Sequence, residues 1–186
     1  MAPIEILFGS LLIVFAVIGL VRGFLRELGV TTVMLIVLLA LHLLEPLLEQ
    51  GLARVLGSSA DATQSARVAS GQTWFFGLVI LIAAFISYAG ETLTFRGERL
   101  GGVLGLVLGL LTGAINGYLI VGSLWYYLDR WDYALGFLGL TTEGLSTTAQ
   151  NAVQYLPLNL LGQPLLLGQS WLLYLAVLLL IGRVIR

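Results

Sequence analysis

The sequence contains no cysteine and no lysine, and it has a single histidine among 186 residues. Without cysteine the chain has no disulfide bond, no thiolate nucleophile and no cysteine-held metal or iron–sulfur cluster. Without lysine it cannot form a phosphate loop of the Walker type. One histidine cannot build a multi-histidine metal site. We therefore expect no metal and no cofactor.

Charge is also scarce, because only 10% of the residues are charged while 59% are hydrophobic, and the mean hydropathy is +1.00. A water-soluble domain of this size with so many hydrophobic and so few charged residues would expose large apolar patches. The composition therefore indicates an integral membrane protein. All nine basic residues are arginine, and at a net charge of −1 they form no broad basic face for nucleic acid. Serine and threonine occur without a triad pattern or a nucleophile elbow, so we expect a non-enzymatic protein.

Five apolar segments predict crossings of the bilayer within one transmembrane domain over residues 1–186. These segments are residues 4–21, 28–48, 74–95, 100–128 and 171–185, the last of which is short. We therefore expect an all-α integral membrane protein, a bundle of four to five transmembrane helices. The first segment lacks a positively charged region before it, so it is not a cleavable signal peptide and is expected to remain in the mature protein.

Two long connections separate the predicted crossings. Residues 49–73 are rich in Ala, Ser, Gly and Gln and predict a mobile outer loop with room for a short helix. Residues 129–170 are apolar but broken by Gly and Pro, and irregular backbone in lipid would leave N–H and C=O groups unpaired. We expect this segment at the outer interface or tucked against the bundle, with Ser146 capping a short helix to about Tyr155 that Pro157 stops.

The arginines predict the orientation, because short cytoplasmic loops carry an excess of positive charge. With five crossings, six arginines share one side and three the other, which places the N-terminus outside and the C-terminus in the cytoplasm. The six are Arg22, Arg26, Arg96, Arg99, Arg183 and Arg186, and the three are Arg54, Arg67 and Arg130. Tryptophan side chains favour the headgroup level of a bilayer. All four tryptophans lie near the predicted outer ends of the segments, which agrees with this orientation: Trp74, Trp125, Trp131 and Trp171.

Glycine recurs at every fourth residue of the fourth segment, at Gly101, Gly105, Gly109, Gly113 and Gly117. A helical glycine is less favourable than alanine by about 1 kcal/mol, so a tight helix contact must offset the loss. Small residues at this spacing allow two backbones to approach within lipid. Asn116 lies beside the stripe, and its amide should find a partner across a helix interface. The stripe packs either against a helix of its own chain or against another copy or protein.

Two ionisable residues lie within the predicted crossings. His42 is expected either as a neutral imidazole bonded to a neighbouring helix or as a proton-sensitive group. Glu91 lies toward the inner end of the third segment, where Arg22 or Arg99 could neutralise it; the alternative is a role in ion passage. Glu5 and Glu45, near the outer ends of the first two segments, are expected to reach headgroups or water.

Residues 22–28 read RGFLREL and directly follow the first apolar segment. They resemble the signature block of the colicin V production protein family, Arg-Gly-Phe-x-Arg-Glu, at Arg22, Gly23, Phe24, Arg26 and Glu27. A second family block, a basic residue before Leu-Gly and further glycines at spacing four, resembles Arg99 and Leu100 followed by the glycine stripe. The resemblance covers roughly residues 1–128, and the chain departs from the usual pattern at Glu98 and Leu108.

The resemblance implies a bacterial inner-membrane protein that is needed to produce or export a peptide toxin and is associated with envelope homeostasis. It implies no catalytic residues. The expected partners are the lipid bilayer and other membrane proteins or further copies of the chain, with no nucleic acid and an unknown substrate. Two other functions stay open: a small oligomeric channel or permease with Glu91, Asn116 and His42 along its path, and an accessory subunit of a larger membrane complex.

Overall fold

A computed structural model describes residues 4–56, 62–90, 95, 101–136, 139–166 and 168–184. Among these residues, four helices are long and apolar enough to cross a membrane. They are α1 (Ile4–Arg22), α2 (Phe24–Leu56), α3 (Ala62–Ala89) and α4 (Gly102–Arg130). The predicted helical fold is confirmed, and these four helices have the length and the apolar composition that a membrane span requires.

Shorter elements follow α4 in the described part of the chain. They are the 3-10 helix η2 (Thr142–Gly144), α5 (Thr147–Val153), α6 (Pro157–Leu161), the antiparallel strands β1 (Pro164–Leu166) and β2 (Gln169–Ser170), and α7 (Trp171–Val184). The Ser146 hydroxyl accepts a hydrogen bond from the amide of Ala149, which confirms the predicted cap. Helix α5 ends at Val153, short of the predicted Tyr155, so Pro157 does not stop it; Pro157 instead opens α6, at a position where its missing N–H is harmless.

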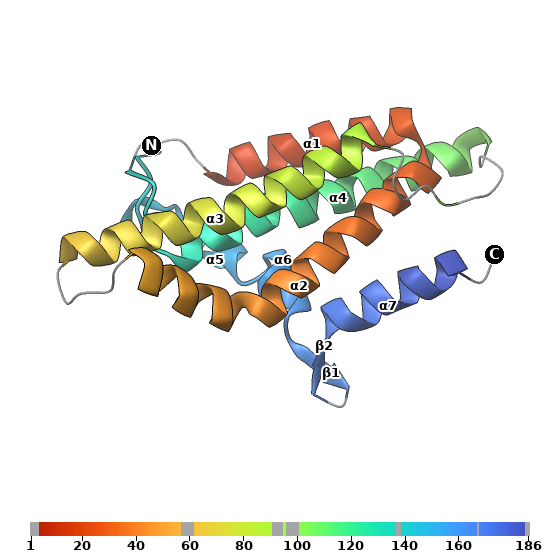
Figure 1. Ribbon diagram of the computed structural model, residues 1–186. Helices are drawn as coiled ribbons and strands as arrows, with labels where there is room; N and C mark the ends of the chain where they lie inside the picture. The colour runs from red at the N-terminus through yellow and green to blue at the C-terminus, as the bar shows by residue number, and fades with distance from the viewer. Residues whose placement is uncertain are drawn as a thin grey trace.

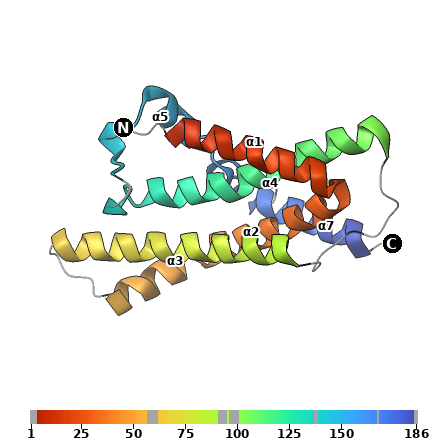
Figure 2. The ribbon, with the colours of Figure 1, turned by 90° about the horizontal axis from the view of Figure 1, so that it is seen from above.

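The four long helices lie side by side with their ends at two opposite poles (Figure 1). We call them the Arg22 end, where α1 ends and α2 begins, and the Trp125 end, where α1 begins and α4 ends. At the Arg22 end α4 begins beyond the last turn of α1 (Figure 2). Helix α7 runs along α2 toward the Arg22 end.

A single glycine makes the turn between α1 and α2. Gly23 has a φ of +87°, a left-handed conformation that costs glycine little. Its amide bonds to the carbonyl of Gly19 at 2.9 Å, and its carbonyl accepts the amide of Glu27 at 3.2 Å. Helix α2 therefore begins at Phe24, four residues before the predicted crossing at residue 28, and Glu27 lies in its first turn.

The predicted loop over residues 49–73 is wrong for most of its length. Helix α2 continues through Pro46 to Leu56, and α3 already begins at Ala62. A proline removes one hydrogen bond and bends a helix, and α2 changes direction along its length in Figure 1. Polar composition suggested a loop, but Ala, Leu, Gln and Arg are good helix formers. The Gln72 side chain also donates to the carbonyl of Glu49 at 3.3 Å, which joins the two helices.

The third and fourth crossings have different boundaries from those predicted. Helix α3 ends at Ala89, directly before Gly90, and residues 91–94 of the crossing predicted to residue 95 lie outside the described residues. Helix α4 begins at Gly102 and extends to Arg130, two residues past the predicted end. Glycine at 90 ends the helix earlier than hydropathy alone indicates, because it weakens a helix interior.

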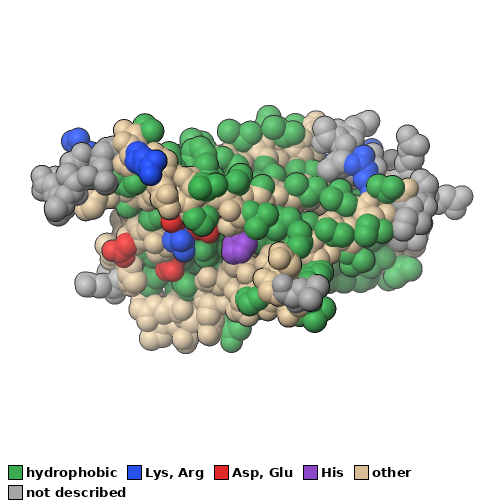
Figure 3. Space-filling model, turned by 60° about the horizontal axis from the view of Figure 1, so that its bottom comes forward, with side chains coloured by type: hydrophobic (Ala, Val, Ile, Leu, Met, Phe, Trp, Pro, Cys, Tyr) green, Lys and Arg blue, Asp and Glu red, His purple; other side chains and the backbone are tan. Residues whose placement is uncertain are grey.

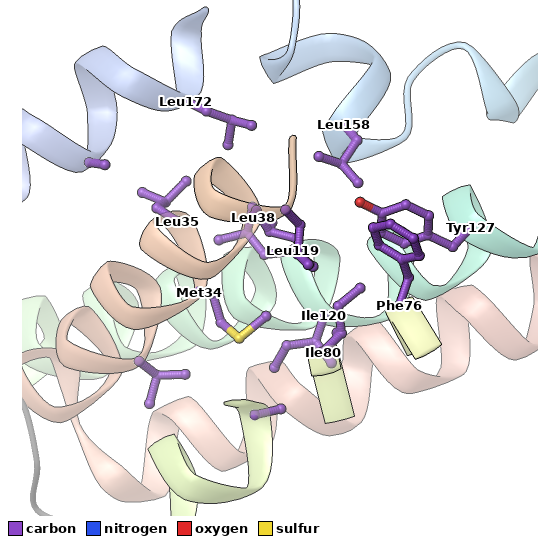
Figure 4. Close-up of a cluster of buried hydrophobic side chains, with 14 residues drawn as sticks. Met34, Leu35, Leu38, Phe76, Ile80, Leu119, Ile120, Tyr127, Leu158 and Leu172 are labelled. Atoms are coloured by element: carbon purple, nitrogen blue, oxygen red, sulfur yellow. The ribbon is translucent and has the colours of Figure 1, made fainter. Parts of the chain in front are cut away.

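The main core lies between α2, α3 and α4 and is closed by α6 and α7. Its largest fully buried side chains include Met34, Leu38, Phe76, Ile80, Leu119, Tyr127 and Leu172 (Figure 4). Leu158 of α6 belongs to the same cluster. The predicted interfacial segment over residues 129–170 is thus partly built into the bundle. Its α6 turn packs on α4, where Pro157 covers Gly122.

Candidate functional site

The glycine stripe of α4 is a close contact with α1 of the same chain. A methyl group on Gly109 would lie 2.7 Å from the carbonyl oxygen of Gly19, and one on Gly113 would lie 2.8 Å from the Gly19 Cα. A methyl group on Gly117 would lie 2.7 Å from the Phe15 Cβ. Side chains at these positions would push the helices apart. Close backbone contact of this kind stabilises helix pairs in lipid through dispersion and Cα–H···O contacts.

The contact does not use the whole stripe. Gly101 is the exposed residue before α4, with open space around it, and Gly105 is only half-buried. The reason is the position of the Arg22 end, because α1 turns back at Gly23 before it reaches the first turn of α4. At the other end the contact surface continues to Gly122, which the four-residue spacing missed because it lies five residues beyond Gly117. We call Gly19, Gly109, Gly113 and Gly117 the glycine seam.

A fully buried carboxylate, Glu27, lies beside the seam. Its Oε2 accepts hydrogen bonds from the hydroxyl of Tyr88 at 3.0 Å and from the amide of Asn116 at 2.8 Å. The Nε of Arg22 lies 3.2 Å from Oε1. The Asn116 amide also donates to the backbone carbonyl of Glu27 at 3.0 Å. Asn116 was predicted to have a hydrogen-bond partner on another helix, and that partner is Glu27 in the first turn of α2.

Two further contacts complete this Glu27 network, which consists of Arg22, Glu27, Thr31, Tyr88 and Asn116. Thr31 donates to the side-chain oxygen of Asn116 at 2.7 Å. The guanidinium of Arg22 lies 4.5 Å from the centre of the Tyr88 ring and donates to the Tyr88 carbonyl at 3.2 Å. Residues of all four long helices therefore meet around one neutralised carboxylate, an arrangement suited to holding helices in register.

The remaining predicted residues lie apart from this network or outside the described part of the chain. Arg26 is exposed at the start of α2, and Phe24 is half-buried. Glu91, Arg99 and Leu100 lie outside the described residues, so the predicted pairing of Glu91 is not placed. One of its two candidate partners, Arg22, pairs with Glu27 instead.

A second charged cluster lies at the Trp125 end. The Nε of Arg130 lies 2.7 Å from Glu45 Oε1 and 3.0 Å from Glu49 Oε1, and Arg130 also donates to the hydroxyl of Tyr126 at 3.4 Å. The expectation that Glu45 reaches headgroups or water is wrong, because its side chain is buried. Glu45 and Glu49 are four residues apart and share one helix face, so both turn toward the arginine. We call these three residues the Arg130 cluster.

His42 lies one turn before Glu45 on α2 and is half-buried. Its ring packs against Gly162, where α6 ends, and a methyl group on Gly162 would lie 3.1 Å from the ring carbon Cε1. Within the described part of the chain the imidazole makes no hydrogen bond, in contrast to the expected bond to a neighbouring helix. Figure 3 shows the histidine on a face where acidic and basic side chains gather beside it.

Polar contacts also fasten the segment that follows α4. Ser146 donates to Glu5 at 2.6 Å and so joins α5 to the start of α1. The Tyr133 hydroxyl accepts from the indole of Trp125 at 2.8 Å and donates to Asp129 at 3.2 Å. Burial raises the pKa of the Tyr133 phenol well above its usual range, so it remains a neutral donor.

The polar side chains described above join helices to one another. Across the described residues, no group of three His, Cys, Asp or Glu side chains is arranged to hold a metal ion. No protein-family model, no curated protein and no solved structure matches this chain.

Proposed function

We propose that this chain is a non-enzymatic protein of the bacterial cytoplasmic membrane of the colicin V production type. It supports toxin export or envelope homeostasis through partner proteins. The observation that carries the proposal is the use of the RGFLREL residues. Gly23 makes the turn between α1 and α2, and Arg22 and Glu27 form the ion pair around which four helices meet.

Helix association in lipid lacks the hydrophobic drive that operates in water, so close packing and polar pairing must hold a bundle together. The signature supplies the turn, the buried carboxylate and its countercharge in six residues. A motif used in this way favours an architectural role over a chemical one. On this proposal the protein acts through the surface that its helix bundle presents to other membrane proteins.

The proposal includes five crossings with the Arg22 end in the cytoplasm. Arg22, Arg26 and Arg183 belong to helix ends at that pole, as the positive-inside rule requires. Helix α7 has 14 residues and is about 21 Å long, which is short against an apolar thickness of about 30 Å. The fifth crossing is therefore a broken one, in which α6 packs on α4 and the β1–β2 hairpin between α6 and α7 projects away from the bundle (Figure 1).

The test is deletion of the gene in its source bacterium, followed by measurement of exported peptide toxin and of leakage of a periplasmic enzyme. We expect deletion to reduce export or increase leakage, and the wild-type gene to restore both. Arg22→Ala should fail to restore them, because it leaves Glu27 buried and unpaired. Arg26→Ala removes the same charge from an exposed position of the same motif and should restore them. Unchanged export and unchanged leakage in the deletion strain would contradict the proposal.

A channel or permease is the second candidate, and the Arg130 cluster beside His42 is the observation that favours it. A path lined by the glycines of several copies has less support, because α1 already fills the seam at Gly109, Gly113 and Gly117. Ion flux into proteoliposomes that contain the purified protein would favour this candidate. A monomeric mass in detergent together with no flux would count against it.

A further inference from the structure

Helix α2 packs differently on the two sides of Pro46. Among the described residues of this helix, the buried ones all lie between Glu27 and Glu45, and none of residues 46–55 is buried. We call residues 47–55 the α2 arm. Its apolar side chains at Leu48 and Leu52 are half-buried and pack at the edge of the main core. Because the arm buries so little, it separates from the bundle more easily than the part of α2 before the proline.

Pro46 supplies a pivot for this arm. A proline has no N–H and its ring crowds the carbonyl four residues earlier, so the helix loses the hydrogen bond to the His42 carbonyl. Helices bend sharply at such places, and Figure 1 shows α2 changing direction along its length. At 1.5 Å per residue, the end of the arm lies about 14 Å beyond the proline, and a pivot of about 30° moves it by roughly 7 Å.

The Arg130 cluster spans the pivot. The Nε of Arg130 lies 2.7 Å from Glu45 Oε1, on the near side of the proline, and 3.0 Å from Glu49 Oε1, on the arm. One guanidinium that binds both sides of the proline fixes the angle of the bend. The Gln72 side chain of α3 adds a hydrogen bond to the backbone carbonyl of Glu49 at 3.3 Å. The arm is therefore held by polar contacts close to its pivot.

The two carboxylates of the cluster differ in how easily they can leave Arg130. The Glu45 side chain is only 9% exposed, whereas that of Glu49 is 28% exposed and belongs to the arm. If Glu49 leaves, Arg130 keeps Glu45 as its partner, so no buried charge is left unpaired. Glu49 itself moves with the arm toward water. Opening the arm therefore avoids the large cost of breaking a buried ion pair.

We propose that the α2 arm is a hinged strap that pivots at Pro46 and is held closed by the ion pair between Glu49 and Arg130. The structure is the closed state, in which Leu48 and Leu52 cover an edge of the core. In the open state Glu49 has left Arg130, and both that edge and the guanidinium are uncovered. Hinges of this kind let a packed element exchange between two positions with little change elsewhere. The hinge does not depend on the function proposed above.

The absence of cysteine allows spin labels to be attached at two introduced cysteines. Labels at Val55→Cys and Thr148→Cys, both exposed positions, measure the end of the arm against α5. Labels at Leu43→Cys and Thr148→Cys are the reference pair, because Leu43 is exposed and precedes the proline. By pulsed electron paramagnetic resonance in nanodiscs, we expect Arg130→Gln to add a second distance to the first pair, displaced by several ångström. The reference pair should keep its single distance.

Charge-matched variants separate release of the arm from general damage. Arg54→Gln removes the same charge from an exposed position of the arm and should leave both pairs as in the wild type. Glu49→Gln keeps the size of the side chain but not its charge, so it should also produce the second distance, and it decides the matter if Arg130→Gln does not fold. An unchanged Val55–Thr148 distance in the variant that folds would overturn the proposal, as would equal shifts in the two label pairs.

A second substitution tests the pivot itself. Pro46→Ala restores the missing N–H and stiffens the helix at this place. Added to Arg130→Gln, it should suppress the second distance several-fold. A second distance that persists unchanged in the double variant would show that Pro46 is not the pivot and would overturn the proposal.

Amide hydrogen exchange tests the unaltered protein. Residues 48–53 of the arm and residues 68–73 of α3 lie beside each other, since Gln72 donates to the Glu49 carbonyl. We expect the amides of residues 48–53 to exchange several-fold faster, because the arm opens about its hinge while α3 has no proline. Exchange in the arm that is equal to or slower than exchange in residues 68–73 would overturn the proposal.

Discussion

At the scale of single residues, Glu27 is the most consequential side chain in the described structure. It is fully buried, and its carboxylate is neutralised by Arg22 while Tyr88 and Asn116 donate to it. Removing one partner of a buried ion pair is costly because the other charge then stays buried and unpaired. The network also joins residues 61 and 89 positions apart in the chain.

We expect Glu27→Ala to lower the free energy of unfolding by about 3–5 kcal/mol, because Arg22 and Asn116 lose their common acceptor. Glu27→Gln keeps one acceptor oxygen and should lose less. Thermal denaturation in detergent, followed by circular dichroism, measures both. Arg26→Ala is the control and should leave the midpoint nearly unchanged. A Glu27→Ala midpoint equal to that of the wild type would contradict the role assigned to this carboxylate.

At the scale of elements, the α1–α4 pair and the segment after α4 show two ways of holding helices together. The seam brings backbones into contact through missing side chains, at Gly19, Gly109 and Gly113. The later segment combines polar contacts, such as the bond from Ser146 to Glu5, with an apolar cluster that contains Ala149 and Leu156. The seam depends on shape, whereas the later segment depends also on hydrogen bonding, so the two respond to different substitutions.

For the seam, we expect Gly109→Leu to abolish the folded peak in detergent gel filtration, since the new side chain would overlap the backbone of Gly19. Leu108→Ala, on the neighbouring helix face, should be mild. Gly101→Leu is a stricter control, because it replaces a glycine of the same stripe that has open space around it. Equal tolerance of Gly109→Leu and Gly101→Leu would refute the packing argument.

For the segment after α4, we expect Ser146→Ala to destabilise α5 by about 0.5–2 kcal/mol through loss of its cap. The substitution also removes the hydrogen bond to Glu5, so α5 should detach from α1 more often. Faster amide hydrogen exchange over residues 147–153, measured by mass spectrometry, is the expected result. Thr147→Ala lies at the next position and should leave exchange unchanged. If both variants exchanged alike, the cap would not be what holds α5.

At the scale of the whole molecule, the structure is a bundle with polar contacts at both ends and an apolar layer between them. The Glu27 network lies toward the Arg22 end and the Arg130 cluster at the Trp125 end. Because the seam is filled within the chain, the bundle has no need of a second copy to bury its glycines.

The proposed topology predicts that a reporter fused after Arg186 lies in the cytoplasm. A fluorescent protein there should be bright and an alkaline phosphatase inactive, whereas a phosphatase fused after Arg54 should be active. This pattern follows from five crossings and from the arginines at the Arg22 end. Phosphatase activity after Arg186 would reduce the number of crossings to four and overturn the broken fifth crossing.

The sequence alone was sufficient for properties that depend on local composition and spacing. Hydropathy located most of α1, α4 and α7, the serine at position 146 indicated a helix cap, and the glycine stripe indicated a close helix contact. Each of these depends on neighbours within a few residues along the chain. The same local reasoning failed at residues 49–73, where polar composition concealed two helix ends.

The pairings between distant segments came from the three-dimensional arrangement. Which helix fills the seam, why Glu27 is buried and why Glu45 faces Arg130 depend on how helices far apart in sequence lie against one another. An arginine near a helix end looks the same in sequence whether it meets a headgroup or a buried carboxylate. Apolar surface drives each helix into the bilayer, but contact geometry selects its neighbours.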